Sequence, residues 1–231
     1  MKTVLVKVSV FFAISLVAAL LSIGLVKGFP FLAIMGNWVS DLRVANLTEP
    51  EPQHPEIVIA AITEDTLKRF PYRSPVDREF LANLVETLQA KGVRAIGIDL
   101  LFDQPTEADK DARLKSVLET YPVPVVTGWT DEKTGLSETQ FAFQASYLQN
   151  VSAGFSNLFK DPVDGTVRNA FVGREEDGVY RESFAALIAK RLGHEVPREG
   201  FRIRYLSPPD ATTPVFAQYP IHATAFLPPA W

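Results

Sequence analysis

The chain has 231 residues, a formal net charge of −4 and no cysteine. Its acidic and basic residues are interspersed, so the sequence gives no sign of the clustered basic face that indicates nucleic-acid binding. The lack of cysteine excludes a disulfide framework, a thiolate zinc site and a cysteine nucleophile, but it leaves the compartment open. The length is enough for one domain with a substantial core, and we interpret the chain as such a domain preceded by a membrane anchor.

An uncharged apolar stretch lies near the amino terminus. It covers residues 8–26, preceded by Lys2 and Lys7 and followed by Lys27. At 1.5 Å per residue, a helix of this length spans about 28 Å, close to the roughly 30 Å hydrocarbon core of a bilayer. A cleaved signal peptide is the alternative, but its apolar region is typically only about 7–15 residues long. The sequence therefore predicts one transmembrane helix within residues 1–28, with membrane lipid as its partner.

The cations around this stretch predict its orientation. Lys2 and Lys7 lie on the amino side, whereas Arg43 is the only lysine or arginine between Lys27 and Lys68. By the positive-inside rule, the amino terminus then stays in the cytoplasm and the rest of the chain is exported. The predicted location is the cytoplasmic (inner) membrane, with the bulk of the protein on its periplasmic or extracellular side.

Residues 29–56 connect the predicted anchor to the exported part. Residues 29–44 are mixed apolar and polar, and they predict a helix that leaves the membrane. Residues 48–55 hold three prolines among polar residues, which predicts an extended, solvated linker. We expect the exported domain to comprise residues 57–231.

A strand and helix alternation follows the linker. Residues 57–62 are an apolar, β-branched run, the pattern of a strand covered on both faces. Ser74 and Pro75 predict the start of a helix, and Gly92 predicts its end. Residues 93–101 predict a second strand. Because a helix separates the two strands, they are expected to form a parallel βαβ unit.

The alternation continues with a helix over residues 108–121 and a strand over 123–129. Further elements are predicted with looser patterns: a strand over 151–158, a hairpin of 167–174 and 179–181 around Asp177-Gly178, a helix capped by Ser183 and ended by Gly193, and a strand over 201–206. The predicted fold class is α/β, an open, mostly parallel sheet with flanking helices, preceded by one transmembrane helix. The apolar Pro-Pro ending fits no closing element, so we expect the natural chain to continue past Trp231.

Acidic residues follow two of the predicted strands. Asp65 comes shortly after the first strand, Asp99 lies near the end of the second, and Asp103 is in the loop that follows. The carboxyl ends of parallel strands border the crevice where ligands bind, and hard cations prefer several carboxylate oxygens. A divalent cation or a cationic ligand is therefore one hypothesis for these residues. The alternative is structural, with Asp99 as a cap or ion-pair partner and Asp103 only solvated.

Two further groups are candidates for a polar site. Arg73 and Arg78 flank the start of the best-defined helix, so either could pair with one of those carboxylates. Residues 161–168 predict a tight turn in which Asp164 and Gly165 supply the turn chemistry and Arg168 follows. This segment lacks the spaced donors and terminal Glu of an EF-hand calcium loop.

The motifs of common enzyme classes are absent from the sequence. There is no Gly-rich phosphate loop, no G-x-S-x-G elbow and no H-E-x-x-H, and the three histidines lie far apart. We expect no cofactor. An exported metal-dependent hydrolase that uses Asp65, Asp99 and Asp103 remains the second hypothesis, and a free-standing envelope protein that binds a partner through a sheet edge is the third.

Five segments taken together resemble one known family. They are Asp41–Arg43, Ile57–Ile62, Phe70–Pro75, Ala95–Asp103, and Asp161–Arg168 with its Asp-Gly-x-x-Arg core. In their order and spacing, from about Asp41 to the end, they resemble the type 2 CHASE domain (CHASE2), an extracellular sensory module associated with cyclases and histidine kinases. The chain departs from the family pattern at Thr63, where an Asp is common. The family's last strand and the membrane helices after it are also missing, and the resemblance implies that they lie past Trp231.

The resemblance implies a periplasmic or extracellular sensor without catalytic activity of its own. It implies that an unknown stimulus, a small ligand or an envelope partner, is coupled to a cytoplasmic output module outside this sequence, such as an adenylate or guanylate cyclase or a histidine kinase. Receptor logic adds the expectation of a homodimer.

Overall fold

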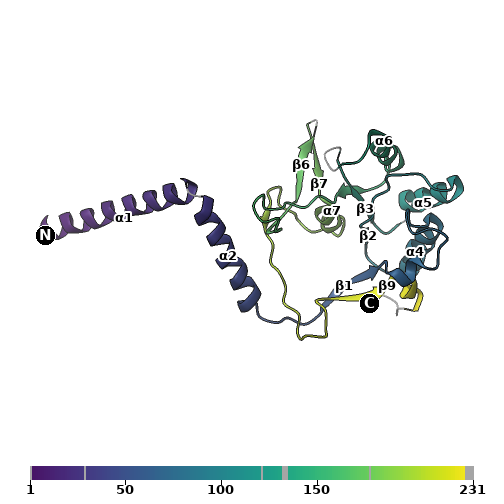
Figure 1. Ribbon diagram of the computed structural model, residues 1–231, viewed down its shortest axis with the longest axis horizontal. Helices are drawn as coiled ribbons and strands as arrows, with labels where there is room; N and C mark the ends of the chain where they lie inside the picture. Colours follow the sequence, from purple (N-terminus) through teal and green to yellow (C-terminus); the bar gives the residue numbers. More distant parts are fainter. Residues whose placement is uncertain (1, 29, 121, 132–134, 177, 227–231) are drawn as a thin grey trace. The chain divides into compact units, whose positions relative to one another are not determined.

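The computed structural model describes residues 2–28, 30–120, 122–131, 135–176 and 178–226. The chain divides into two compact units (Figure 1). The first consists of Met1–Pro52 and Tyr205–Val215, and the second of Gln53–Arg204 and Phe216–Trp231.

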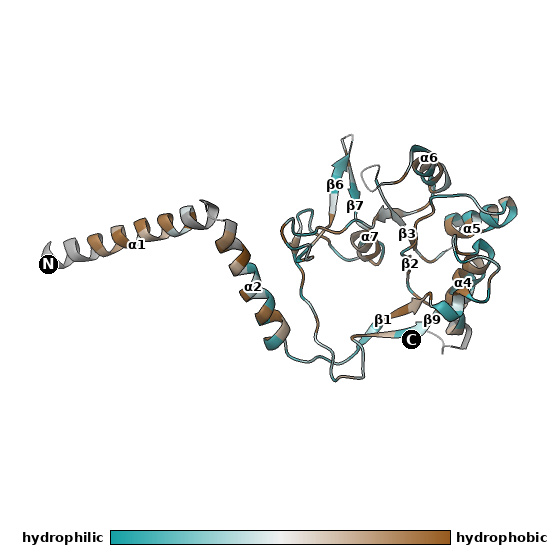
Figure 2. Ribbon diagram, viewed as in Figure 1, coloured by the Kyte–Doolittle hydropathy of each residue, from teal (hydrophilic) through white to brown (hydrophobic). Residues whose placement is uncertain are grey.

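The first unit contains two helices, where the sequence predicted a transmembrane helix and a helix that leaves the membrane. Helix α1 spans Lys2–Gly28 and helix α2 spans Pro30–Leu47. Apolar residues are frequent along both helices (Figure 2). Within the part of the chain that the structure describes, no helix combines the length and the apolar character that a membrane crossing requires. The segment after α2 is extended, and the Glu51 amide donates a hydrogen bond to the Ser207 carbonyl at 3.1 Å.

A three-stranded parallel sheet forms the centre of the second unit. Its order is β2 (Ile96–Ile98), β3 (Val125–Trp129) and β4 (Ala153–Phe155). Helices α4 (Arg78–Ala90), α5 (Ala108–Thr120) and α6 (Glu138–Tyr147) lie on one side of this sheet, and α7 (Phe184–Arg191) lies on the other (Figure 1). The sequence pattern predicted all of these elements except α6, although the predicted strands are longer than the observed ones.

The hydrophobic core lies between this sheet and the three helices on its first side. Its buried members come from α4, β2, α5, β3, the end of α6 and the following turn: Leu81, Ala82, Val85, Ile96, Ile98, Phe102, Leu114, Val117, Leu118, Val125, Tyr147, Leu148 and Val151. The apolar residues of α4 and α5 recur at helical spacing, which is why each helix buries one face and leaves the other in solvent. Tyr121, the last residue of the predicted helix, lies outside the described residues.

Helix α7 approaches the opposite face of the sheet closely because two strands carry glycine there. A Cβ atom on Gly154 would lie 2.7 Å from the backbone nitrogen of Phe184, and one on Gly97 would lie 2.7 Å from Cδ1 of Ile188. Ser183 caps α7 by accepting a hydrogen bond from the Ala186 amide, and Gly193 ends it with a φ of +86°. Both of these helix boundaries were predicted.

The first predicted strand does not join the central sheet. Strand β1 (His54–Ala61) pairs in parallel with β9 (Phe216–Pro220), so the expected pairing of the first two strands is wrong. Strand β9 was not predicted, because it is short, follows Pro214 closely, ends at Pro220 and has no continuous apolar run. The expectation that β1 is covered on both faces is also wrong, since Ile57, Val58 and Ile59 are 42–51% exposed. The described residues thus form separate small sheets in place of one continuous open sheet.

The remaining elements are short. Strands β6 (Gly173–Glu176) and β7 (Val179–Glu182) form the predicted antiparallel hairpin, and β5 (Asn169–Ala170) pairs with β8 (Phe201–Arg202). Helix α3 covers Glu64–Leu67, and a 3₁₀ helix covers Ile221–Phe226.

The start of α4 differs from the prediction. Asp77, and not Ser74, is the N-cap, because its carboxylate accepts a hydrogen bond from the Phe80 amide at 2.8 Å. Lys110 also binds this carboxylate at 2.7 Å. Burial disfavours the ionised form of Asp77, but these hydrogen bonds outweigh burial and hold its pKa below the ordinary value.

Candidate functional site

The carboxyl ends of β2, β3 and β4 bring polar residues to one edge of the central sheet. Asp99 follows β2, Thr130 and Asp131 follow β3, and Ser156 and Asn157 follow β4. Because the three strands are parallel and adjacent, these residues share the edge at which open α/β sheets bind ligands. We call this group the carboxyl-edge site.

Asp99 contacts the neighbouring strand end directly. The Ser156 hydroxyl donates a hydrogen bond to Oδ1 of Asp99 at 3.4 Å. Gly128 of β3 lies between them, and a Cβ atom there would be only 2.5 Å from the Ser156 hydroxyl oxygen. Glycine at this position therefore leaves the room in which the two strand ends can interact.

The other acidic residues of this edge are held by partners from outside the sheet. Asp103 accepts a hydrogen bond from Nε2 of Gln140 on α6 at 2.7 Å. Asp131 is 7% exposed and binds Arg174 of β6, whose guanidinium lies 4.5 Å from the centroid of the Phe155 ring. The sequence reasoning missed Asp131 and Arg174. Asp131 could have been found from the sequence, because it is an acidic residue shortly after the predicted strand 123–129.

Buried polar atoms at the same strand ends lack hydrogen-bond partners. Four buried side-chain atoms of the described residues make no hydrogen bond here. They are Trp129 Nε1 and Thr127 Oγ1 of β3, Asn157 Oδ1 after β4, and Gln144 Oε1 of α6. Each such group costs free energy unless water or a ligand satisfies it. The carboxyl-edge site therefore includes buried polar atoms that lack a protein partner among the described residues.

Two predicted site residues make other contacts. Asp65 lies on α3 and pairs with Lys68 at 2.9 Å, and its side chain is 75% exposed. Arg73 pairs with Glu64 at 2.7 Å, and both of these side chains are 64% exposed. Exposed pairs of this kind contribute little to stability. Of the described residues, no three His, Asp or Glu side chains gather where they could hold a metal ion, and this includes Asp65, Asp99 and Asp103, for which a bound cation was one hypothesis.

Asp164 and Arg168 do come together, within a tight turn. Arg168 is 5% exposed, and its two terminal nitrogens bind the Asp164 carboxylate at 2.6 and 3.1 Å. It also binds Asp161 at 2.9 Å. Asp164 further accepts a hydrogen bond from the Thr166 amide, and Gly165 has a φ of +72°. These contacts close the turn on itself, so the Asp-Gly-x-x-Arg core is structural.

This turn predicts a loss of stability in acid. Arg168 and the Thr166 amide hold the pKa of Asp164 well below its ordinary value. A depressed pKa gives stability that is fully present above the unfolded-state value of about 3.9 and is lost as the pH falls further. We expect the urea midpoint to fall mainly as the pH drops below about 4, and to fall less in the Asp164→Asn variant. Equal losses in both proteins would contradict this role.

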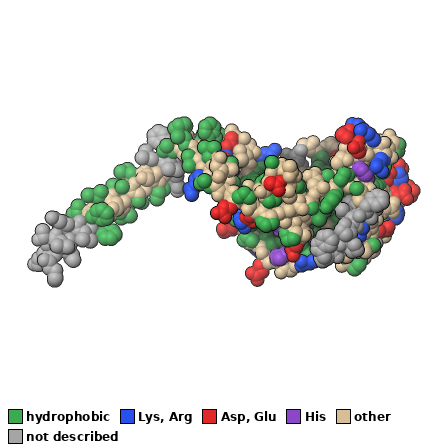
Figure 3. Space-filling model, turned by 90° about the horizontal axis from the view of Figure 1, so that it is seen from below, with side chains coloured by type: hydrophobic (Ala, Val, Ile, Leu, Met, Phe, Trp, Pro, Cys, Tyr) green, Lys and Arg blue, Asp and Glu red, His purple; other side chains and the backbone are tan. Residues whose placement is uncertain are grey.

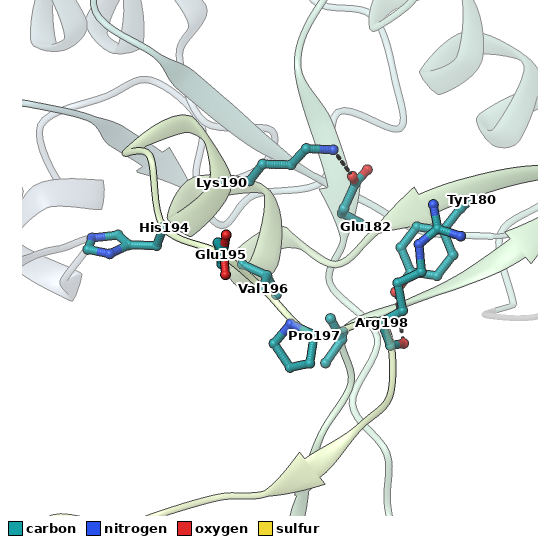
Figure 4. Close-up of a pocket in the computed structure, with 9 residues that line it drawn as sticks. Tyr180, Glu182, Lys190, His194, Glu195, Val196, Pro197 and Arg198 are labelled. Atoms are coloured by element: carbon teal, nitrogen blue, oxygen red, sulfur yellow. Dashed lines mark hydrogen bonds and ion pairs between the residues drawn. The ribbon is translucent and has the colours of Figure 1, made fainter.

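A second surface that could hold a ligand lies between β7 and the segment after α7. It is an open depression of about 380 Å³, lined by Tyr180 and Glu182 of β7, Lys190 of α7, and residues 194–198 (Figure 4). Lys190 points toward Glu182 and pairs with it. Arg198 lies against the Tyr180 ring, 5.1 Å from its centroid, while the Tyr180 hydroxyl donates to the Arg198 carbonyl at 3.1 Å. The Lys190–Glu182 pair already satisfies two of the charges that line the depression.

Comparison with known proteins assigns a family to the chain. A family model described as the CHASE2 domain matches residues 13–225. No curated protein and no solved structure matches the chain. The matched residues include the carboxyl-edge site, the 161–168 turn and most of both units. The chain therefore belongs to the CHASE2 domain family, which is a family of sensory domains of signalling receptors.

Proposed function

We propose that this chain is the extracytoplasmic sensory input domain of a transmembrane receptor. The observation that carries the proposal is the CHASE2 match over residues 13–225, which begins within α1 and covers most of the α/β unit. The output module would be a cytoplasmic cyclase or kinase. The described residues hold no grouping of three metal-binding side chains, so the structure gives no support for a metal-dependent hydrolase.

The proposed topology rests on the amino-terminal sequence. The uncharged stretch of residues 8–26 is the proposed anchor, and Lys2 and Lys7 keep the amino terminus inside. The α/β unit would then lie on the periplasmic or extracellular side. In this arrangement, α2 and the segment around Pro50 connect the anchor to the domain.

The carboxyl-edge site is the place where we propose that the stimulus acts. A ligand can shift a receptor between two states only if it binds one state better than the other. Trp129 Nε1 and Asn157 Oδ1 are buried without a hydrogen-bond partner among the described residues, and a second state that uncovers them would offer these hydrogen bonds to a ligand. Asp131 and Arg174 connect this edge to the β6–β7 hairpin, and α7, which follows the hairpin, covers the far face of the sheet. Ligand binding at this edge would therefore favour one position of the hairpin and of α7 over another.

A topology reporter tests the proposed function most directly. Gly135 has a φ of +86° and open space around it, so an insertion there should leave the fold intact. Alkaline phosphatase, which is active only outside the cytoplasm, should be active when inserted at Gly135 of the full chain. The same enzyme fused ahead of Lys2 should be inactive. The reverse pattern would overturn the proposed orientation, and with it the sensory role.

A further inference from the structure

The depression between β7 and the segment after α7 carries charges of both signs. Two acidic residues, Glu182 and Glu195, and two basic residues, Lys190 and Arg198, line it. All of its lining residues belong to the second unit, so one unit forms the whole depression. Its volume of about 380 Å³ lies at the lower end of the range of about 300–1,000 Å³ that small-molecule sites occupy. The depression therefore has room for a small ligand.

Pairing within the protein accounts for only two of these four charges. Lys190, in the last turn of α7, pairs with Glu182 of β7 (Figure 4). Within the described ranges, Glu195 makes no ion pair and the Arg198 guanidinium contacts no carboxylate. One carboxylate and one guanidinium in the depression therefore remain without an opposite charge.

Tyr180 holds Arg198 in place. The Arg198 guanidinium lies over the Tyr180 ring, 5.1 Å from its centroid, and the Tyr180 hydroxyl donates a hydrogen bond to the Arg198 carbonyl at 3.1 Å. Stacking uses the face of the guanidinium, so the N–H groups at its edge stay available for a carboxylate. A side chain that is already positioned loses less conformational freedom when a ligand binds.

Glu195 and Arg198 are placed so that one small molecule can contact both. Three residues of chain span at most about 11 Å, and Pro197 favours an extended conformation at Val196. In Figure 4 the Glu195 and Arg198 side chains lie on opposite sides of Val196 and Pro197. Val172, which is 4% exposed, adds a third apolar residue to the lining. The two charges therefore flank an apolar surface.

The balance of charge indicates the class of ligand. A ligand with only negative charge would meet Glu182 and Glu195, and one with only positive charge would meet Lys190 and Arg198. Acidic and basic side chains are also interspersed on the face of the α/β unit in Figure 3, which gives that face no single sign to attract either kind of ion. A molecule that carries both an ammonium and a carboxylate group satisfies both unpaired residues at once.

We propose that this depression binds a small zwitterion of the amino-acid class. The ligand's ammonium group pairs with Glu195, its carboxylate pairs with Arg198, and its side chain lies against Val196 and Pro197. Binding requires neither the proposed membrane orientation nor an output module, so the site goes beyond the proposed function. The ligand would lie beside the Lys190–Glu182 pair that connects β7 to the end of α7, and it would hold β7 and the segment after α7 together.

The test is thermal unfolding of the full chain, purified in detergent and followed by circular dichroism with each of the common L-amino acids at millimolar concentration. A ligand that binds only the folded state raises the melting temperature, and the concentration dependence of this rise gives the dissociation constant. We expect at least one amino acid to bind. Its N-acetyl form, which lacks the ammonium charge, and its amide, which lacks the carboxylate, should each bind about tenfold more weakly or worse.

Matched variants locate the binding. Glu195→Gln and Arg198→Gln should also weaken it by about tenfold or more, whereas Glu199→Gln and Arg94→Gln, at exposed positions outside the depression, should leave it unchanged. Three results would overturn the proposal: no amino acid raises the melting temperature, the N-acetyl form or the amide binds as tightly as the amino acid, or the two pairs of variants bind alike. The phosphatase reporter is measured separately, so a wrong topology and an absent ligand site give different results.

Discussion

Replacement of Asp111 by asparagine should lower the free energy of unfolding by about 3–5 kcal/mol, because it leaves a buried cation without its counter-charge. That cation is Arg78, which is 1% exposed and lies with its Nε 3.4 Å from Oδ1 of Asp111. The guanidinium also lies 4.6 Å from the centroid of the Phe102 ring. Burial lowers the pKa of Arg78, and the Asp111 carboxylate opposes that shift. Asparagine keeps an acceptor for the Thr106 amide, so the variant isolates the loss of charge.

The measurement is urea unfolding followed by circular dichroism, with two comparisons. Arg113→Gln removes a cation whose side chain is 38% exposed and pairs with Glu86, and it should cost less than about 1 kcal/mol. Arg78→Met combined with Asp111→Asn should be less destabilised than Asp111→Asn alone, because no unpaired charge remains. A cost for Asp111→Asn as small as that of Arg113→Gln would show that Arg78 does not need its partner.

The alternation of strand and helix was readable from the sequence because it depends on local patterns. The apolar face of α4, the cap at Ser183 and the stop at Gly193 each follow from residues close together in the chain. The pairing of β1 with β9 could not be read in this way. It joins residues about 160 positions apart, and no local sequence pattern in either strand specifies which strand it pairs with.

The carboxyl-edge site was predictable in part for the same reason. Asp99 and Asp103 lie at a strand end that the apolar pattern located, and parallel pairing of β2 and β3 then places them at one edge. Arg174 reaches Asp131 from the hairpin, so its role depends on a tertiary contact between distant segments. Asp65 was expected at the same edge only because β1 was expected in the same sheet, and the correction of β1 removes that reason.

The contact between β4 and α7 predicts a second large effect. Gly154→Ala should lower the free energy of unfolding by about 3 kcal/mol, the upper end of the range for overpacked sites. The added Cβ would lie 2.7 Å from the nitrogen and 2.8 Å from the Cα of Phe184. Those atoms belong to the backbone of the first turn of α7, so the whole helix would have to move away from the sheet. Urea unfolding of the variant and of the original chain measures the difference.

Gly97→Ala provides the matched comparison on the same face. Its added Cβ would meet Cδ1 of Ile188 at 2.7 Å and Cζ of Phe184 at 2.8 Å, which are the far ends of side chains. Side chains can change rotamer, so the cost should be about 1 kcal/mol. The order of the two variants is the decisive result, because only a helix whose backbone rests on β4 makes Gly154 the more sensitive position. A larger loss of unfolding free energy in Gly97→Ala than in Gly154→Ala would contradict this packing. It would show that α7 contacts the sheet through its side chains and that its backbone is not held against β4.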